Sequence, residues 1–363
     1  MAKLGWKSAE KFEEIESGNI EPTRANLNKL AEIYRKPLIA FYLAEPPKDS
    51  NAAHDFRTLP DPDRRTEQIL QTLVRDVQAR LDIVRAALDE ADEAAILNYV
   101  GSINLRMKPD SVAKSIAAEI KFSGQDFANC ENVNEAFSKL RIAVEASGVF
   151  VLIESNLGSH HSNIGAGVFR GFALSDSVAP FIVINAKDTK AAWAFTLIHE
   201  LTHIWMGQSA LSGYDSKIAV EKFCDEVAAS YLLDEGFLIN SHLDRSNAIT
   251  SLASSVSDMA NQCNLSRRMI AYNLMTRGRI SGAEYAALTT LFTVQRVQVN
   301  PDQEPESGGP SYYVLRRHRL GAYLVSTVNR FVSEGFLTTT KAARVLGVKP
   351  TAVFKTLETR RAA

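Results

Sequence analysis

Positions 199–203 read His-Glu-Leu-Thr-His, and these residue types at this spacing can bind a metal ion and hydrolyse a bond. They lie in the segment 191–206, which contains no proline or glycine and is predicted to be a helix. On a helix, residues four apart share one face, so His199 and His203 can direct two imidazoles at one zinc ion. Glu200 is turned about 100° from His199, where its carboxylate can accept a proton from zinc-bound water. We therefore expect a zinc-dependent hydrolytic site of the HExxH type.

A third protein ligand is needed if the fourth zinc position is to hold water. The segment 217–233 is predicted to be a helix, and it offers the carboxylates of Glu221, Asp225 and Glu226. Glu221 and Asp225 are four apart and share a face, and a buried carboxylate would need a cation or donors beside it. Spacing alone favours Glu221 over Asp225 only weakly, and both side chains could instead be solvated. Cys224, in the same segment, is expected to be a buried core residue.

Two short apolar segments, 149–154 and 181–185, could hold an extended substrate beside the motif helix by strand addition. Ordinary core strands are the alternative, and we expect that role for them. His160 and His161 lie in the Gly- and Ser-rich loop 156–167, where a histidine near zinc could bind an oxyanion or could simply be exposed.

The composition fits a globular protein with a substantial core. The chain has 363 residues, of which 45% are hydrophobic and 23% charged, with a formal net charge of -1. These values argue against disorder, collagen and low complexity. No apolar run reaches the roughly 18–20 residues of a membrane span, and none follows the N-terminus as a signal peptide requires. The three cysteines are far apart, which argues against a disulfide scaffold and leads us to expect a cytoplasmic protein.

Charge is unevenly distributed along the chain. Residues 311–363 hold ten lysines and arginines against two acids, a net charge of +8. Residues 181–240 hold four lysines against eight acids, a net charge of -4. The basic tail is either a solvated surface or a surface for an anionic partner such as DNA.

Apolar spacing and turn residues divide the chain into segments. Helical spacing predicts helices over 8–17, 23–35, 67–98 and 133–147 and helical structure throughout 245–292, and apolar β-branched runs predict strands at 149–153 and 181–184. Stretches rich in proline at 45–65 and 301–310 are predicted linkers. The expected organisation is a helical segment over 1–50, a linker and long amphipathic helix over 51–104, the zinc-bearing domain with a helical extension over 105–300, a linker over 301–310 and a basic helical region over 311–363.

The motif segments resemble the ImmA/IrrE family of metallo-endopeptidases in its long form. The run from Phe195 to Gly207 resembles the family's zinc helix, and the run from Glu221 to Leu233 resembles its second motif. The resemblance implies that Glu221 is the third zinc ligand and Glu200 the general base. It also implies an α+β fold, mainly helical, with a zincin-like peptidase core, a small sheet and helical N- and C-terminal regions. Asp225 stands where the family usually has asparagine, which adds a carboxylate near the metal.

Both ends of the chain resemble helix-turn-helix segments. Residues 7–37 resemble the second half of an XRE-type helix-turn-helix, but Glu13, Glu14 and Glu16 lie on the would-be recognition helix. We therefore expect this remnant to pack or to bind a partner rather than to read DNA. Residues 338–353 are also helix-turn-helix-like and are basic, so they are the better candidate for DNA binding.

The expected function is that of a zinc metallo-endopeptidase, a peptide-bond hydrolase. The resemblance implies that it cleaves an XRE-type repressor and so derepresses stress or mobile-element genes. The alternative is a non-catalytic zinc-binding transcription regulator or toxin–antitoxin component, in which zinc is structural and a fourth side chain such as Asp225 or His242 closes the site. No membrane partner is expected.

Overall fold

The computed structural model describes most of the chain. The described residues are 13–15, 17–34, 38–43, 64–158, 162–208, 214–233, 235–246, 248–299 and 311–358. The chain divides into two compact units, Met1–Ala53 and His54–Ala363. The predicted linker 301–310, most of the linker 45–65, most of the predicted helix 8–17, and His160 and His161 all lie outside the described residues.

The smaller unit contains a helix and a short 3-10 turn. Helix α2 (Arg24–Tyr34) confirms the helix predicted over 23–35, and η2 (Leu38–Phe41) follows it. Leu27 and Leu30 are buried in a small cluster against Leu38 and Phe41. The helix-turn-helix interpretation of this segment stays a prediction.

A three-stranded sheet forms the centre of the larger unit. Its strands are β1 (Phe150–Ile153), β2 (Gly171–Leu174) and β3 (Phe181–Ile184), in the order β1-β3-β2. Strand β3 pairs parallel with β1 and antiparallel with β2. The structure confirms the two predicted strands, whereas β2 was not predicted. Strand β3 is paired on both sides, so 181–185 is a core strand, as expected, and does not offer a free edge for strand addition.

Helices cover both faces of the sheet. Alternate strand residues such as Val151, Ile153 and Ile182 enter one core. The helices that contribute buried residues to this core are α4 (Pro109–Ile120), α5 (Gly124–Ala128), α6 (Val133–Ala146), α7 (Lys190–Trp205), α8 (Tyr214–Leu232), α9 (Glu235–Asn240), α10 (Ala248–Gln262), α11 (Arg267–Thr276) and α12 (Gly282–Val299).

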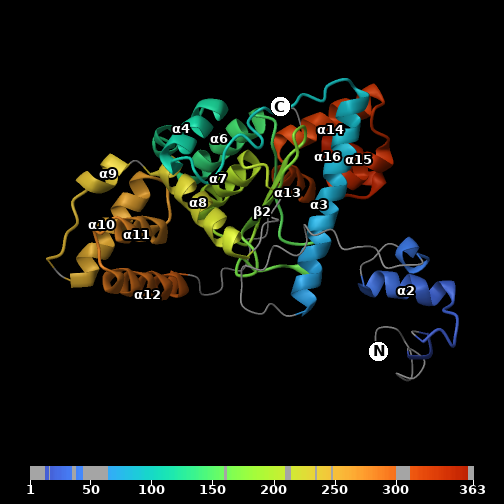
Figure 1. Cartoon of the computed structure of the whole chain (residues 1–363), viewed down its shortest axis with the longest axis horizontal. Coiled ribbons are helices and arrows are strands. Elements are labelled where there is room, and N and C mark those ends of the chain that lie inside the picture. The colour runs from blue at the N-terminus through green and yellow to red at the C-terminus, as the bar shows by residue number, and fades with distance from the viewer. Residues whose placement is uncertain are drawn as a thin grey trace. The chain divides into compact units, whose positions relative to one another are not determined.

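The basic C-terminal region packs on the opposite face of the sheet. Phe150, Leu152 and Phe181 point into this second core, together with α3 (Arg64–Glu90). The C-terminal elements that close it are α13 (Tyr312–Leu320), α14 (Ala322–Glu334), α15 (Thr339–Leu346), η5 (Pro350–Ala352) and α16 (Val353–Leu357). Figure 1 shows α3 beside these helices. Residues 311–358 therefore share one hydrophobic core with the sheet.

A buried ionic network links the second core to the sheet. Glu154 follows β1 directly, and its side chain is only 4% exposed. Its Oε1 atom lies 3.0 Å from Arg80 of α3 and 2.9 Å from Arg316 of α13. Arg316 also donates to the Leu346 carbonyl at 2.7 Å. Part of the positive charge of the tail is therefore matched by acids elsewhere in the chain.

One predicted helix ends earlier than the apolar spacing suggested, and one predicted helical stretch is divided by turns. Helix α3 stops at Glu90, because Asp92 adopts a left-handed conformation with φ of 55°. The stretch 245–292 is interrupted at Asn264 and Gly278, where φ is 56° and 68°. The prediction of helical structure throughout this stretch was wrong. Apolar residues continue at helical spacing through the turns, whereas the positive φ values at Asn264 and Gly278 end the helices there.

The fold class is as predicted, mainly helical α+β with a small sheet. Within the described residues, none of the helices combines the length and the apolar character that crossing a membrane requires.

Candidate metal centre

The two motif histidines lie on α7, one turn apart. Helix α7 is held between the sheet and α8 by apolar residues such as Leu197, Ile198 and Leu201, which are completely buried. His199 and His203 therefore point to the same side of the helix, and their Nε2 atoms lie 3.2 Å apart. The side chains are 13% and 10% exposed, so both imidazoles are largely shielded from solvent.

Helix α8 places a carboxylate opposite these imidazoles. Glu221 Oε2 lies 3.3 Å from His199 Nε2, and Glu221 Oε1 lies 3.4 Å from His203 Nε2. One ligand atom from each of the three residues lies within 4.8 Å of the others. Two imidazole nitrogens and a carboxylate are the donor types that zinc prefers, and their convergence on a small volume fits a metal ion. The cluster could therefore hold a metal.

Asp225 lies on the other side of the His199 ring. Its Oδ1 atom is 2.9 Å from His199 Nδ1, one helical turn beyond Glu221. Metal-binding histidines commonly direct their second ring nitrogen at a carboxylate, which fixes the orientation of the ring. Burial lowers the pKa of His199, but the carboxylates of Asp225 and Glu221 and the charge of Glu200 outweigh it and raise the pKa to about 10. The negative charges of these carboxylates therefore favour a cation beside His199.

Glu200 lies on the face of α7 that approaches β2. It is 8% exposed. Burial raises its pKa to about 7, the positive charge of His199 opposes that rise, and the negative charges of Glu221 and Asp225 add to it. A carboxyl group with a pKa near neutrality can both accept and release a proton under physiological conditions.

Strand β2 is the sheet edge beside α7. The Asn185 N–H donates to the Arg170 carbonyl at 2.8 Å, just before β2 begins. Backbone groups of successive strand residues alternate between the two edges, so the N–H and C=O groups of Gly171 and Ala173 point away from β3. Among the described strands, β2 has a neighbour on this one side only. The outer edge of β1 differs, because Arg141 donates to the Val151 carbonyl there.

Sequence reasoning missed β2. The strand is only four residues long, begins with glycine and contains alanine, so neither β-branched content nor length marked it. The usable signal was the glycine itself, because a strand glycine often marks a close approach of another element.

The other candidate ligands are not part of the cluster. Within the described residues, the group that could hold a metal contains neither Asp225 nor His242. His242 is exposed. Cys224 is fully buried, and burial raises the pKa of its thiol, so it remains a protonated core residue.

Comparison with known proteins identifies the domain that carries this site. No curated protein and no protein of known structure matches the chain. Residues 145–275, which include all three strands and helices α7 and α8, match the Peptidase_M78 family model, described as an IrrE N-terminal-like domain. This match supports a metallopeptidase-type function. Residues 145–275 are thus a domain of the Peptidase_M78 family, in agreement with the resemblance to ImmA/IrrE proteins.

Proposed function

We propose that the protein is a zinc-dependent endopeptidase of the HExxH type. In this proposal His199, His203 and Glu221 hold the zinc ion, and Glu200 is the general base. The observation that carries the proposal is the convergence of two Nε2 atoms and one carboxylate within 4.8 Å. Asp225 orients His199 from the opposite side of the ring, where it lies 2.9 Å from Nδ1.

The chain's own residues suit peptide-bond hydrolysis. When bound, zinc supplies the Lewis acidity that lowers the pKa of water towards about 7. The Glu200 carboxylate accepts a proton from the attacking water, whose oxygen forms a bond to the peptide carbonyl carbon. As the C–N bond breaks, Glu200 returns that proton to the leaving amine nitrogen. The raised pKa of Glu200, about 7, fits a group that must take and then release a proton.

An extended segment of the substrate would lie along β2. The outward N–H and C=O groups of Gly171 and Ala173 offer the hydrogen bonds of one more antiparallel or parallel strand. Glu200 packs beside Gly171, since a Cβ atom added there would meet Glu200 Cγ at 3.1 Å. A peptide on this edge would therefore pass close to the general base.

The substrate class follows from the resemblance to ImmA/IrrE proteins. We propose an XRE-type repressor in the cytoplasm, whose cleavage would derepress stress or mobile-element genes. The test is co-incubation of the protein with a repressor encoded nearby, with and without chelator, followed by intact-mass measurement. Two fragments that appear only without chelator are expected.

Two variants separate the base from the ligands. Glu200→Gln keeps the shape of the side chain and should bind zinc but not cleave, whereas His203→Ala should lose both zinc and cleavage. Glu226→Gln, an exposed carboxylate on α8, is the matched control and should behave as wild type. Cleavage by Glu200→Gln at the wild-type rate would show that the proposed mechanism is wrong.

The alternative of a purely structural zinc site requires a fourth protein ligand. The cluster found among the described residues contains three. DNA binding by residues 338–353 would be a separate property, and its test is salt-dependent retention of duplex DNA by the full chain.

A further inference from the structure

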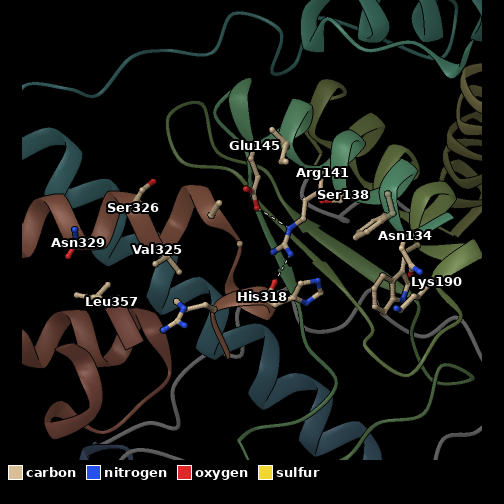
Figure 2. Close-up of a pocket in the computed structure, with 16 residues that line it drawn as sticks. Asn134, Ser138, Arg141, Glu145, Lys190, His318, Val325, Ser326, Asn329 and Leu357 are labelled. Carbon is tan, nitrogen blue, oxygen red and sulfur yellow. Dashed lines mark hydrogen bonds and ion pairs between the residues drawn. The ribbon is translucent and has the colours of Figure 1, made fainter. Parts of the chain in front are cut away.

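A cavity of about 610 Å³ lies where the C-terminal helices meet the peptidase domain. One wall comes from α6 and the first turn of α7, and the other comes from α13, α14 and the end of α16 (Figure 2). Its described lining includes none of the residues of the metal cluster. The volume falls within the roughly 300–1,000 Å³ that small-molecule sites occupy.

The floor of the cavity is a fixed ion pair. Arg141 Nε lies 3.0 Å from Glu145 Oε1, and Arg141 Nη1 donates to the His318 carbonyl at 2.6 Å. Figure 2 shows these two interactions as dashed lines. The other oxygen of Glu145 accepts the Tyr323 N–H at 3.2 Å, at the start of α14. Among the described lining residues Glu145 is the one carboxylate, and its charge is already paired with that of Arg141.

Gly321 brings the turn between α13 and α14 directly onto this pair. Its φ is +87°, and an added Cβ atom would lie 2.1 Å from Glu145 Oε1 and 2.7 Å from Arg141 Nη2. No side chain fits there without displacing the pair. The floor is therefore built from two chain segments far apart in sequence that hold each other in place.

Three basic side chains around the cavity have no acidic partner. Within the described residues, no carboxylate forms an ion pair with Lys190, Arg317 or His318. Arg317 uses Nη1 to donate to the Glu358 carbonyl at 2.9 Å. Burial lowers the pKa of His318, and the positive charges of Arg141, Lys190 and Arg319 lower it further. The cavity therefore has a positive potential that a negatively charged ligand would relieve.

The rest of the lining is apolar or neutral. Phe137 and Trp193 pack edge to face with their ring centroids 5.2 Å apart. Ile142, Val325 and Leu357 extend this apolar surface, and Asn134, Ser138, Ser326 and Asn329 add uncharged hydrogen-bonding groups. A bare inorganic anion would leave the apolar part in contact with water.

We propose that this cavity binds a small organic anion, with its carboxylate or phosphate group against Lys190 and His318 and its apolar body against Trp193 and Val325. Lys190 is the first residue of α7, nine residues before His199, which corresponds to about 13 Å along the helix. A bound ligand would thus contact both the helix that carries the metal histidines and the C-terminal helices. Because the ligand would bind only when α7 and the C-terminal helices are packed together, it would stabilise that packing.

Isothermal titration calorimetry on the full chain tests the ligand class with five probes. Octanoate and phenyl phosphate are organic anions, inorganic phosphate lacks an apolar body, and octanamide lacks the charge. We expect one octanoate or phenyl phosphate per chain, bound at least tenfold more tightly than inorganic phosphate or octanamide. Benzoate, which shares the ring of phenyl phosphate and differs from it only in the charged group, distinguishes a carboxylate from a phosphate ligand. Equal binding of octanamide or inorganic phosphate, or no binding of either organic anion at 10 mM, would overturn the proposal.

Matched variants test the position of the site. Lys190→Gln combined with His318→Gln should weaken binding of the better probe at least tenfold, and both side chains are exposed enough to be replaced without disturbing the core. Lys187→Gln removes an exposed charge from the loop that leads into α7 but not from the cavity lining, and it should change affinity less than twofold. Wild-type affinity in the double variant, or equal loss in the Lys187→Gln control, would contradict the assignment. The outcome does not depend on peptidase activity.

Discussion

Replacement of Gly171 by alanine should disturb the catalytic helix without touching any proposed ligand. Gly171 is the first residue of β2, and α7 approaches its Cα closely. An added Cβ atom would lie 2.5 Å from Thr196 Cγ2, 3.0 Å from the Val183 carbonyl oxygen and 3.1 Å from Glu200 Cγ. The backbone does not have the positive φ that would disfavour alanine, so the effect is purely steric.

The magnitude follows from these distances. Non-bonded carbon atoms are most stable about 3.5–4.0 Å apart, so the contact with Thr196 requires a movement of about 1 Å. Overpacking of this kind costs about 1–3 kcal/mol of unfolding free energy. A displacement of about 1 Å at reacting groups lowers the rate by about 100-fold, and Glu200 lies on the displaced face of α7. We therefore expect a folded protein that cleaves roughly 100-fold more slowly.

The assay is chemical denaturation together with the rate of repressor cleavage. Gly167→Ala is the matched control, because a Cβ atom there meets nothing within 4 Å, and both quantities should stay at wild-type values. Thr196→Ser removes the methyl group that clashes, so adding it to Gly171→Ala should restore part of the lost stability. If Gly171→Ala cleaves at the wild-type rate, the close packing of α7 on β2 does not position the general base.

Three further changes probe other parts of the structure. Glu154→Gln should lower the unfolding free energy by about 3–5 kcal/mol, measured by urea denaturation, because Arg316 loses its carboxylate partner and Arg80 keeps only Asp76. Burial raises the pKa of Glu154, but the charges of Arg80 and Arg316 outweigh it and keep that pKa below its usual value. In wild type this stability is therefore present above about pH 4.5 and is lost as the pH falls further. Asp225→Ala should weaken zinc binding about 10–100-fold in a chelator competition, because His199 loses the side chain that faces its Nδ1 atom, whereas Glu226→Ala should not. In the metal-free protein, Glu200→Gln should have a higher melting temperature than wild type at pH 8 and the same melting temperature at pH 4.5. The reason is that burial raises the pKa of Glu200 to about 7, so its charge destabilises the folded protein only as the pH rises. A difference of equal size at both pH values would contradict this.

The site was predictable from sequence because its geometry is local to two helices. The four-residue spacing of His199 and His203 fixes their relative direction on any helix, and Glu221 and Asp225 follow the same rule on α8. What spacing could not decide was which of the two carboxylates approaches the imidazole Nε2 atoms. That depends on the rotation of α8 about its axis, which is set by packing against α7 and α4. In the structure Glu221 lies beside both Nε2 atoms, and Asp225 lies beside Nδ1 of His199.

The fold was predictable only where a segment determines its own conformation. The runs of β1 and β3 are rich in valine and isoleucine and read directly as strands, whereas β2 exists because β3 and α7 lie beside it. The role of residues 311–358 depended on long-range contacts. Their composition suggested either a solvated basic surface or a surface for an anionic partner, and it did not reveal that Leu320 and Phe331 are completely buried in the second core. Pairing of Arg316 with Glu154 could not be inferred from local sequence, because 162 positions separate them.

The most direct measurement of the central claim is anomalous diffraction from zinc-loaded crystals on both sides of the zinc absorption edge. We predict one strong anomalous peak about 2.0–2.2 Å from Nε2 of His199, Nε2 of His203 and a carboxylate oxygen of Glu221. Asp225 should remain on the Nδ1 side of His199, and no fourth side chain should reach the ion. A peak away from these three residues, or a fourth protein ligand in the coordination shell, would contradict the hydrolytic assignment.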